Sequence, residues 1–365
     1  MILQLYFARR FFVLFAMVFG VFLGLVFLVE ITEQLRKFGA LEDSFRRIVG
    51  LAALRCAETL YMGLPLVMMV ATLAMFTGLA RSSELVVTRA SGRSALRALV
   101  PPAIVALLLG AAAVALMNPI VATTISEYND RTRILISGED RTVSISEQGL
   151  WLREGDARGQ RVIFAENANE DGSELHMVQF LAFDPDGVPQ QRLQAERAVL
   201  QDGYWDLINA KSWSLFETPN PEAESQILEI FKVPSTLTRE TIRDSFGKPN
   251  TVSIWEMPAF IQSLEAAGFS SRAHRVWFHM ELAQPLLLLS MMLIGAAFTM
   301  RHVRAGRTGV MVLTAVMLGF GLTFVRNLSR ILSENGQLPV ELAAWAPPVA
   351  ALLLSVGILL NMEDG

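Results

Sequence analysis

Six stretches of this chain carry no charged side chain over roughly the 20 residues that a helix needs to cross the hydrocarbon of a membrane. They are residues 11–29, 59–80, 98–125, 282–300, 308–325 and 342–362. Buried helices of large soluble proteins rarely give even one such run. Only 18% of the residues are charged, whereas about a quarter are charged in soluble domains. The sequence therefore predicts an α-helical membrane protein with six transmembrane helices.

The first stretch follows Arg9 and Arg10, as the apolar part of a secretion signal would. Its apolar run is longer than that of a typical signal, and no small-residue cleavage site follows it. We therefore interpret it as a retained first span. The chain has one cysteine, Cys56, so that a disulfide within the chain is impossible and a cysteine-based metal site is not expected.

The basic residues between the stretches are distributed unevenly. Residues 1–10, 81–97 and 301–307 hold nine of them, whereas the short loops on the opposite side, residues 34–54 and 331–341, hold four. Short cytoplasmic loops are enriched in Lys and Arg, so this distribution predicts that both termini are cytoplasmic. The four outer basic residues, Arg36, Lys37, Arg46 and Arg47, run against this rule and need a separate reason.

The long segment between the third and fourth stretches has the pattern of strands. Short runs rich in Val, Ile, Phe and Trp, such as "RVIFAE" and "ELHMVQFLAF", are separated by turn formers such as "DPDG" and "QDG". The pattern predicts seven or eight antiparallel strands in an all-β sandwich or jelly roll on the outer face, inserted between helices 3 and 4. We divide the chain into residues 1–125 with helices 1–3, residues 126–250 with the β domain, and residues 251–365 with an extra helix and helices 4–6.

The extra helix follows the β domain. Ile254, Met257, Ile261 and Leu264 have helical spacing, and Gly268 is a typical C-terminal stop. Two interpretations fit this segment equally well. It lies at the membrane interface and leads into the fourth span, or it packs on the β domain.

A short basic segment, "RSSELVVTRASGRSALR" at residues 81–97, separates the second and third stretches. Ser82 or Ser83 can cap a helix of about residues 82–92, Glu84 suits its first turn, and Gly92 ends it. Such a helix on the cytoplasmic face is either a basic tether to anionic lipid headgroups or a docking element for a cytoplasmic partner.

Three segments of the chain resemble one known family. They are "SELVVTRASG" after the second stretch, "SEQGLW" at the start of the β region, and "SLEAAGFSSRAHRVWFHMELAQPL" before the fourth stretch. On these segments the chain resembles the lipopolysaccharide export permeases of the LptF/LptG family, and more the LptG branch, over nearly its whole length. The resemblance implies six spans, a periplasmic jelly roll between the third and fourth, and a coupling helix that sits in a groove of a separate ATPase.

The same resemblance implies the partners and the coupling residues. The partners would be an LptF-like permease subunit, an LptB-like ATPase dimer, an LptC-like single-span protein and lipopolysaccharide itself, with no nucleic acid. The chain would lie in the bacterial inner membrane. The coupling helix would carry Glu84 at the family's acidic position, together with Leu85, Arg89 and Gly92.

Lipopolysaccharide carries phosphates, carboxylates and acyl chains, so that its site needs cations at headgroup depth above apolar walls. The resemblance places basic substrate contacts at Arg36 and Lys37, and Glu33 could orient them by pairing. The alternative for these two residues is ordinary snorkelling to phospholipid headgroups. Glu30 stands where the family can carry a further basic residue, which is a departure from its pattern.

Other candidate contacts lie at the span ends and in the β region. Arg326, near the outer end of the fifth span, is expected to face the bundle interior or an aqueous cavity, and Arg131 and Arg133 are candidates at the base of the β domain. Glu58 and Glu281 lie near span ends and are expected to form structural pairs. Edge strands of such domains can pair into a continuous apolar groove, for which the candidate linings are Leu150, Trp151, Ile163 and Phe164.

The chain lacks the motifs of the enzyme classes that were considered. It has no G-x-x-x-x-G-K-[ST] phosphate loop, no H-E-x-x-H and no G-x-S-x-G. We therefore expect a transporter subunit without cofactors of its own, with ATP hydrolysed by the partner ATPase. The alternative is a membrane-anchored assembly or sensor protein whose β domain binds a partner, although an anchor needs only one span.

Overall fold

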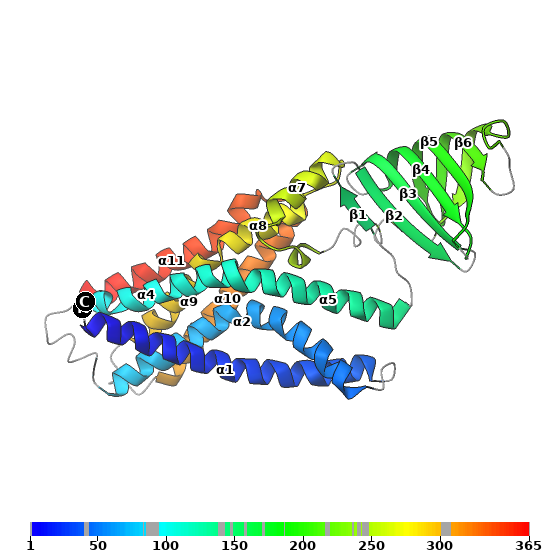
Figure 1. The fold of residues 1–365 in the computed structure, drawn as a ribbon. Coiled ribbons are helices and arrows are strands. Elements are labelled where there is room, and N and C mark those ends of the chain that lie inside the picture. Colours follow the sequence, from blue (N-terminus) through cyan, green and yellow to red (C-terminus); the bar gives the residue numbers. More distant parts are fainter. Residues whose placement is uncertain are drawn as a thin grey trace. The chain divides into compact units, whose positions relative to one another are not determined.

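The computed structural model describes residues 2–39, 44–82, 84, 95–137, 143–146, 149–156, 159–169, 172–185, 187–215, 220–235, 237–238, 242, 248–300 and 308–364. The chain forms two compact units. The helical unit comprises Met1–Asn129, Ser253–Trp255 and Arg275–Gly365, and the β unit comprises Asp130–Val252 and Glu256–His274. Figure 1 labels helices and strands of both units.

Long apolar helices make up the helical unit. They are α1 (Ile2–Phe38), α2 (Phe45–Arg81), the continuous run of α4 (Ala95–Ala112), a π-helical turn η1 (Ala113–Met117) and α5 (Asn118–Ser137), then α8 (Arg272–Leu282), α9 (Gln284–Thr299), α10 (Thr308–Glu334) and α11 (Val340–Asp364). Five of the six uncharged stretches lie within one of these helical runs, and the sixth, residues 282–300, extends from the end of α8 across the bend and through α9. Within the described residues, five helices are long and apolar enough to span a membrane. The pair α8 and α9, which is bent by 49°, makes a sixth if it is one span.

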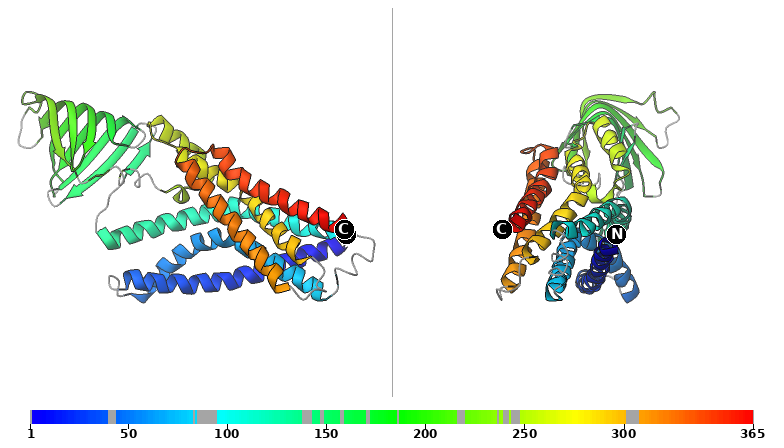
Figure 2. Two further views of the ribbon diagram at one scale, coloured as in Figure 1. Left: turned by 180° about the vertical axis from the view of Figure 1, so that it is seen from behind. Right: turned by 90° about the vertical axis from the view of Figure 1, so that its left-hand side faces the viewer.

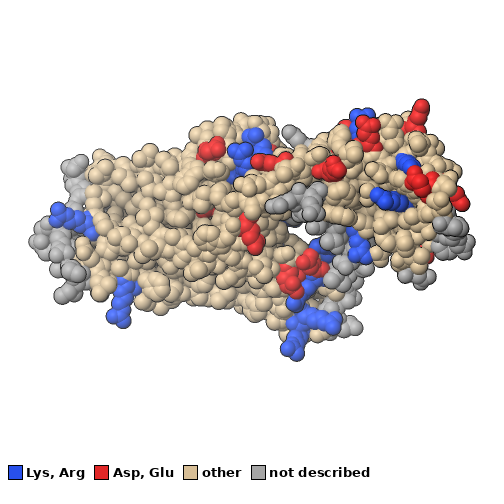
Figure 3. All heavy atoms as spheres, turned by 45° about the horizontal axis from the view of Figure 1, so that its top comes forward, with Lys and Arg blue, Asp and Glu red and all other residues tan. Residues whose placement is uncertain are grey.

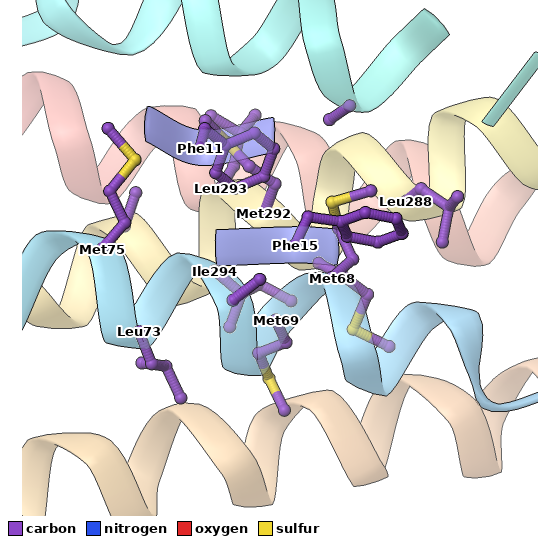
Figure 4. Packing of buried hydrophobic residues seen from close by; sticks show 14 of the residues in the cluster. Phe11, Phe15, Met68, Met69, Leu73, Met75, Leu288, Met292, Leu293 and Ile294 are labelled. Carbon is purple, nitrogen blue, oxygen red and sulfur yellow. The ribbon is translucent and has the colours of Figure 1, made fainter. Parts of the chain in front are cut away.

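Helix α9 is the centre of the helical unit, because α2, α4, α10 and α11 all pack against it. Its side chains Leu288, Met292, Leu293 and Ile294 meet those of α1 and α2 in one buried cluster (Figure 4). Two contacts require small residues. A Cβ on Gly110 of α4 would lie 2.5 Å from Cα of Pro285, and a Cβ on Gly295 would lie 3.0 Å from Cβ of Thr72. Glycine at these positions therefore lets α4 and α2 approach α9 closely.

The β unit contains a sheet of seven strands that pair antiparallel in chain order, β1 to β7. The strands are β1 (Val143–Ser146), β2 (Gly149–Asp156), β3 (Gly159–Ala168), β4 (Glu174–Phe183), β5 (Pro189–Gln201), β6 (Tyr204–Ser214) and β7 (Gln226–Pro234). The strand number agrees with the prediction, but the topology differs from it. A sandwich or jelly roll has two packed sheets with crossing connections, whereas the described strands form one meander, because each hairpin turn joins neighbours.

In strands β3 to β7 the alternation of buried and exposed residues shifts by one position. The shift occurs at residues that lie side by side across the sheet. Each of these strands has two consecutive residues that avoid the buried face. They are Glu166 and Asn167, His176 and Met177, Glu196 and Arg197, Ile208 and Asn209, and Glu229 and Ile230. Met177 and Asn209 have φ of 51° and 53°, and the pairing skips this row in each ladder. Such irregularities bend and twist a sheet, and Figure 2 shows this sheet curved.

Helix α7 (Met257–Ala266) packs on the buried face of the sheet, because Leu264, Ala267 and Phe269 belong to the same apolar cluster as Trp205 and Phe180. The helix ends at Gly268, as predicted, with φ of 88°. Phe269 N–H donates to Leu264 O and Gly268 N–H to Glu265 O, which is a Schellman ending. Of the two interpretations of this segment, the structure supports packing on the β domain.

Candidate functional site

Glu84 lies where α1 begins and α2 ends, and it accepts hydrogen bonds from three side chains. Arg10 Nη1 donates to both carboxylate oxygens, at 2.8 and 2.7 Å, Tyr6 donates at 3.0 Å and Ser82 at 2.8 Å. The hydrogen bond from Arg10, more than those from Ser82 and Tyr6, holds the pKa of the Glu84 carboxyl below its usual value. Because the Arg10 and Glu84 side chains are 27% and 36% exposed, their ion pair contributes no more than about 1 kcal/mol.

The other residues implied for the coupling helix, Leu85, Arg89 and Gly92, lie outside the described residues. Ser82 caps the C-terminus of α2, since its backbone N–H donates to Gly78 O. The described part of residues 81–97 therefore consists of the end of α2, Glu84, which is tied to α1, and the first residues of α4.

Glu33, Arg36 and Lys37 form the pairs that the sequence suggested. Arg36 Nη2 and Lys37 Nζ lie 2.8 and 3.1 Å from Glu33 Oε1 in the last turns of α1. Arg36 is exposed, and binding of substrate by this group stays a prediction. An exposed pair of cations beside one carboxylate carries net positive charge and can attract phosphate or carboxylate groups.

Glu30 and Gln34 fix the rotation of α1 about its axis. Thr59 of α2 donates to Glu30 Oε1 at 2.7 Å, and Tyr128 of α5 donates to Gln34 Oε1 at 3.0 Å. Glu30 and Gln34 are both buried. Since a helix is rigid over two turns, these contacts set the direction in which Glu33 and Arg36 project. The acidic residue that departs from the family pattern is thus part of the packing between α1, α2 and α5.

Arg326 of α10 is partly buried and donates to Gln284 Oε1 of α9 at 3.1 Å. It therefore faces the bundle interior, as expected of a cation near a span end. Arg131 and Arg133 of α5 are exposed, and Arg133 Nη2 lies 2.5 Å from Asp130 Oδ1. Contact of any of these three residues with substrate stays a prediction.

Glu281 has the least exposed carboxyl group of the candidate residues, and sequence reasoning identified it only as a member of a structural pair. Tyr61 of α2 and Asn118 of α5 both donate to its Oε2, the latter at 3.2 Å. Glu58, the other acidic residue of this kind, pairs with Arg55 at 3.0 Å. Scanning for uncharged stretches missed Tyr61 and Asn118, because neutral polar side chains do not interrupt such a stretch. A tyrosine and an asparagine inside apolar runs were the available signal.

The four candidate linings of the β groove do not share a face. Leu150 and Ile163 are 0% and 1% exposed and belong to the buried cluster. Trp151 is 43% exposed and packs against Phe164, its partner across the β2–β3 ladder, with ring centroids 4.7 Å apart and the rings tilted by 48°. Successive residues of a strand point to opposite faces, so Trp151 and Phe164 are wrong as linings of the face that holds Leu150 and Ile163. That face is lined instead by Leu150, Leu152, Ile163 and Ala165.

Charged side chains on the helical unit gather toward its ends, and the middle of the face shown in Figure 3 is almost uncharged. The candidate residues of this unit fall into three places. These are the hydrogen-bonded cluster around Glu84, the exposed cations of α1, and the polar network of Glu281, Gln284 and Arg326 inside the bundle. The cluster around Glu84 can contact a partner at the helix ends. The exposed cations of α1 can attract an anionic ligand, and the network of Glu281 can hold helices together.

Comparison with known proteins gives a consistent result. A family model described as "Lipopolysaccharide export system permease LptF/LptG" matches residues 5–361. The chain is 22% identical over 378 residues to the lipopolysaccharide export system permease protein LptG of Escherichia coli K12, with 99% of this chain and 98% of that protein covered. The protein of the same name from Escherichia coli O6:H1 matches with the same identity and coverage.

Proposed function

Since the chain belongs to the LptF/LptG family of lipopolysaccharide export permeases, we propose that it is one permease subunit of an ABC-type exporter. It extracts lipopolysaccharide from the outer leaflet of the inner membrane and passes it to a periplasmic bridge toward the outer membrane. A separate ATPase dimer supplies the energy, and an LptF-like second permease and an LptC-like single-span protein complete the complex. Both termini are cytoplasmic in this proposal, and the β unit is periplasmic.

The observation that carries the proposal is the family match over residues 5–361, on a chain whose helices flank an inserted β sheet. The sheet has a continuous apolar face, from Leu150 in β2 to Val233 in β7, which α7 and neighbouring side chains bury in this structure; in the proposal, acyl chains lie on it after the face has opened. Among the described strands, the edge strands β1 and β7 each pair with one neighbour, so that either edge could take a strand from another domain. Transfer of an acylated substrate needs both features.

Energy transfer is proposed to enter at Glu84. Its carboxylate accepts hydrogen bonds from Arg10 and Tyr6 of α1. Glu84 itself follows the C-terminal end of α2 by three residues. A partner that moves the segment around Glu84 would therefore pull on α1 and α2 together. The exposed Arg36 and Lys37 of α1 would then move with the helix that binds the headgroup.

The experiment is lipopolysaccharide release from the purified complex in lipid vesicles, driven by ATP. Glu84→Ala is expected to abolish release while the complex still assembles and copurifies. Arg10→Gln is the matched control, because it removes the cation of α1 that pairs with Glu84 and leaves the Glu84 carboxylate in place. Loss of release in Glu84→Ala alone would assign Glu84 to an external partner, and equal loss in both would assign it to the α1 link. Normal release in Glu84→Ala would remove the coupling role.

The substrate contact of α1 is tested by crosslinking. Reversal of Arg36 and Lys37 to glutamate is expected to weaken photocrosslinking of lipopolysaccharide to a probe in α1, because two cations near Glu33 become anions. Crosslinking of phospholipid to the same probe is the internal control. An equal loss for both lipids would support ordinary snorkelling and contradict a specific site.

A further inference from the structure

Glu281 is 2% exposed and lies one turn before the first residues of α9, at the bend of 49° between α8 and α9. Tyr61 and Asn118 donate hydrogen bonds to its Oε2. A carboxylate inside a bundle of apolar helices is costly unless it is paired, and such residues are functional candidates by default. The contacts of its partners show what Glu281 connects.

Asn118 connects Glu281 to the segment that returns from the β unit. Its Nδ2 donates to Glu281, and its Oδ1 accepts the backbone N–H of Ile254 at 2.8 Å. The neighbouring Trp255 donates its indole N–H to Ala115 O, at 3.2 Å, inside the π-helical turn η1. π-Turns within helices often occur at functional sites. Two hydrogen bonds therefore fasten Ser253–Trp255, a part of the helical unit, to the third span.

On the other side of the bend, the same network reaches α10. Gln284 follows Glu281 by three residues and accepts a hydrogen bond from Arg326 Nη2 at 3.1 Å. Glu281 and Arg326 also attract each other electrostatically. The bend itself is held in place, because Pro285 packs directly over Gly110 of α4, where a Cβ would lie 2.5 Å from Cα of Pro285.

We propose that Glu281 is a positioning residue that joins the return segment at residues 253–255 to α10. The carboxyl group of Glu281 holds Asn118 on one side, and Gln284, one turn further along the chain, holds Arg326 on the other. Without water to replace them, broken contacts would leave polar groups unpaired inside the bundle, so that the network favours being either wholly formed or wholly open. A displacement of α10 is therefore transmitted to the return segment, and the reverse.

This inference deepens the proposed function and rests on it for its role in transport. The return segment carries the chain from the β unit back to the fourth span, and α10 carries the candidate substrate contact Arg326. Through Glu281, binding of lipopolysaccharide at Arg326 would change the position of the return segment at residues 253–255. Tyr61 brings α2, which ends beside Glu84, into the same network.

The physical link is tested on the full-length protein in lipid nanodiscs, by hydrogen exchange of the Ile254 amide. Arg326→Met removes the cation on α10, which among the described residues is connected to Ile254 through the network, and is expected to speed exchange about two- to thirtyfold. Asn118→Ala is the positive control, since it removes the acceptor itself. Arg330→Met is the matched negative control, because Arg330 pairs with Glu334 on its own helix.

Glu281→Gln provides a second variant if Arg326→Met does not fold. Glutamine keeps an oxygen acceptor for Tyr61 and Asn118 but loses the charge that attracts Arg326, and we expect faster exchange than in the wild type. Unchanged exchange at Ile254 in the folded charge variants, with faster exchange in Asn118→Ala, would overturn the proposal. An equally large effect of Arg330→Met on exchange at Ile254 would also overturn the proposal.

The role in transport is tested separately, as lipopolysaccharide released per ATP hydrolysed by the assembled complex. We expect Glu281→Gln to lower this ratio severalfold while ATP hydrolysis and complex assembly stay normal. If the wild-type complex releases no lipopolysaccharide, the proposed function fails and the exchange result still decides the link. If the wild type releases it and Glu281→Gln does so equally well, the positioning role in transport is refuted.

Discussion

Substitution of Gly268 by alanine is expected to destabilise the β unit strongly. Gly268 ends α7 with φ of 88°, and a Cβ there would lie 2.1 Å from the carbonyl oxygen of Ala168 in β3. The left-handed backbone costs an L-residue about 1–2 kcal/mol, and overpacking against a fixed atom costs about 1–3 kcal/mol. The sum is about 2–5 kcal/mol. Relief by movement is hindered, because Ala168 N–H also donates to Ala267 O at 2.9 Å.

Gly203→Ala is the matched control. Gly203 has φ of 85°, but nothing lies within 4 Å of a Cβ there, so that only the backbone cost of about 1–2 kcal/mol applies. The assay is hydrogen exchange of strand amides in the full-length protein, in which 1.4 kcal/mol corresponds to about a tenfold loss of protection. Protection should fall by about 30- to 3000-fold for Gly268→Ala, and less for the control. Equal losses in the two variants would refute the assignment of the clash.

Three further results are expected. Gly110→Val should lower the thermal stability of the detergent-solubilised chain by about 1–3 kcal/mol, since its Cβ meets Cα of Pro285, whereas Gly357→Ala, with open space around it, should not. The pKa of the Glu84 carboxyl is lowered, so the Arg10–Glu84 link should be complete above the usual carboxyl pKa and be lost as pH falls through the lowered value. In Arg10→Gln, the pKa of Glu84 followed by carboxyl NMR should therefore rise. An unchanged pKa would contradict the pairing. Trp205→Ala, at a fully buried side chain, should cost the β unit about 3–5 kcal/mol in the same exchange assay.

The helices were predictable because uncharged length is a direct physical requirement for crossing a bilayer. Five of the six uncharged stretches lie within one helical run and the sixth covers the bent pair of α8 and α9, and the strand pattern began and ended in the expected part of the chain. Gly268 was recognisable as a helix end because few other residues adopt its conformation. The pairing of Glu33 with Arg36 and Lys37 was also accessible, since it is local along one helix.

Long-range contacts were not predictable from the pattern. Arg10 and Glu84 are 74 residues apart, and Tyr61 and Glu281 are 220 apart, so that nothing in either local segment indicates the partner. The meander could not be distinguished from a jelly roll, because strand patterns do not contain the order of pairing. The groove assignment at Trp151 and Phe164 failed for a similar reason, since two adjacent residues of a strand cannot both line one face.

The one-position slip shared by strands β3 to β7 makes the sheet sensitive to insertions and deletions. On either side of the slip, buried and exposed residues alternate regularly. The two sides pair in register because each of the strands β3 to β7 has one extra exposed residue at the same row. Deletion of Glu196 alone would remove the extra residue from β5, so that one half of β5 would shift by one position against β4 and β6, which keep theirs. A length change in this part of the chain can therefore be accommodated only when adjacent strands change together.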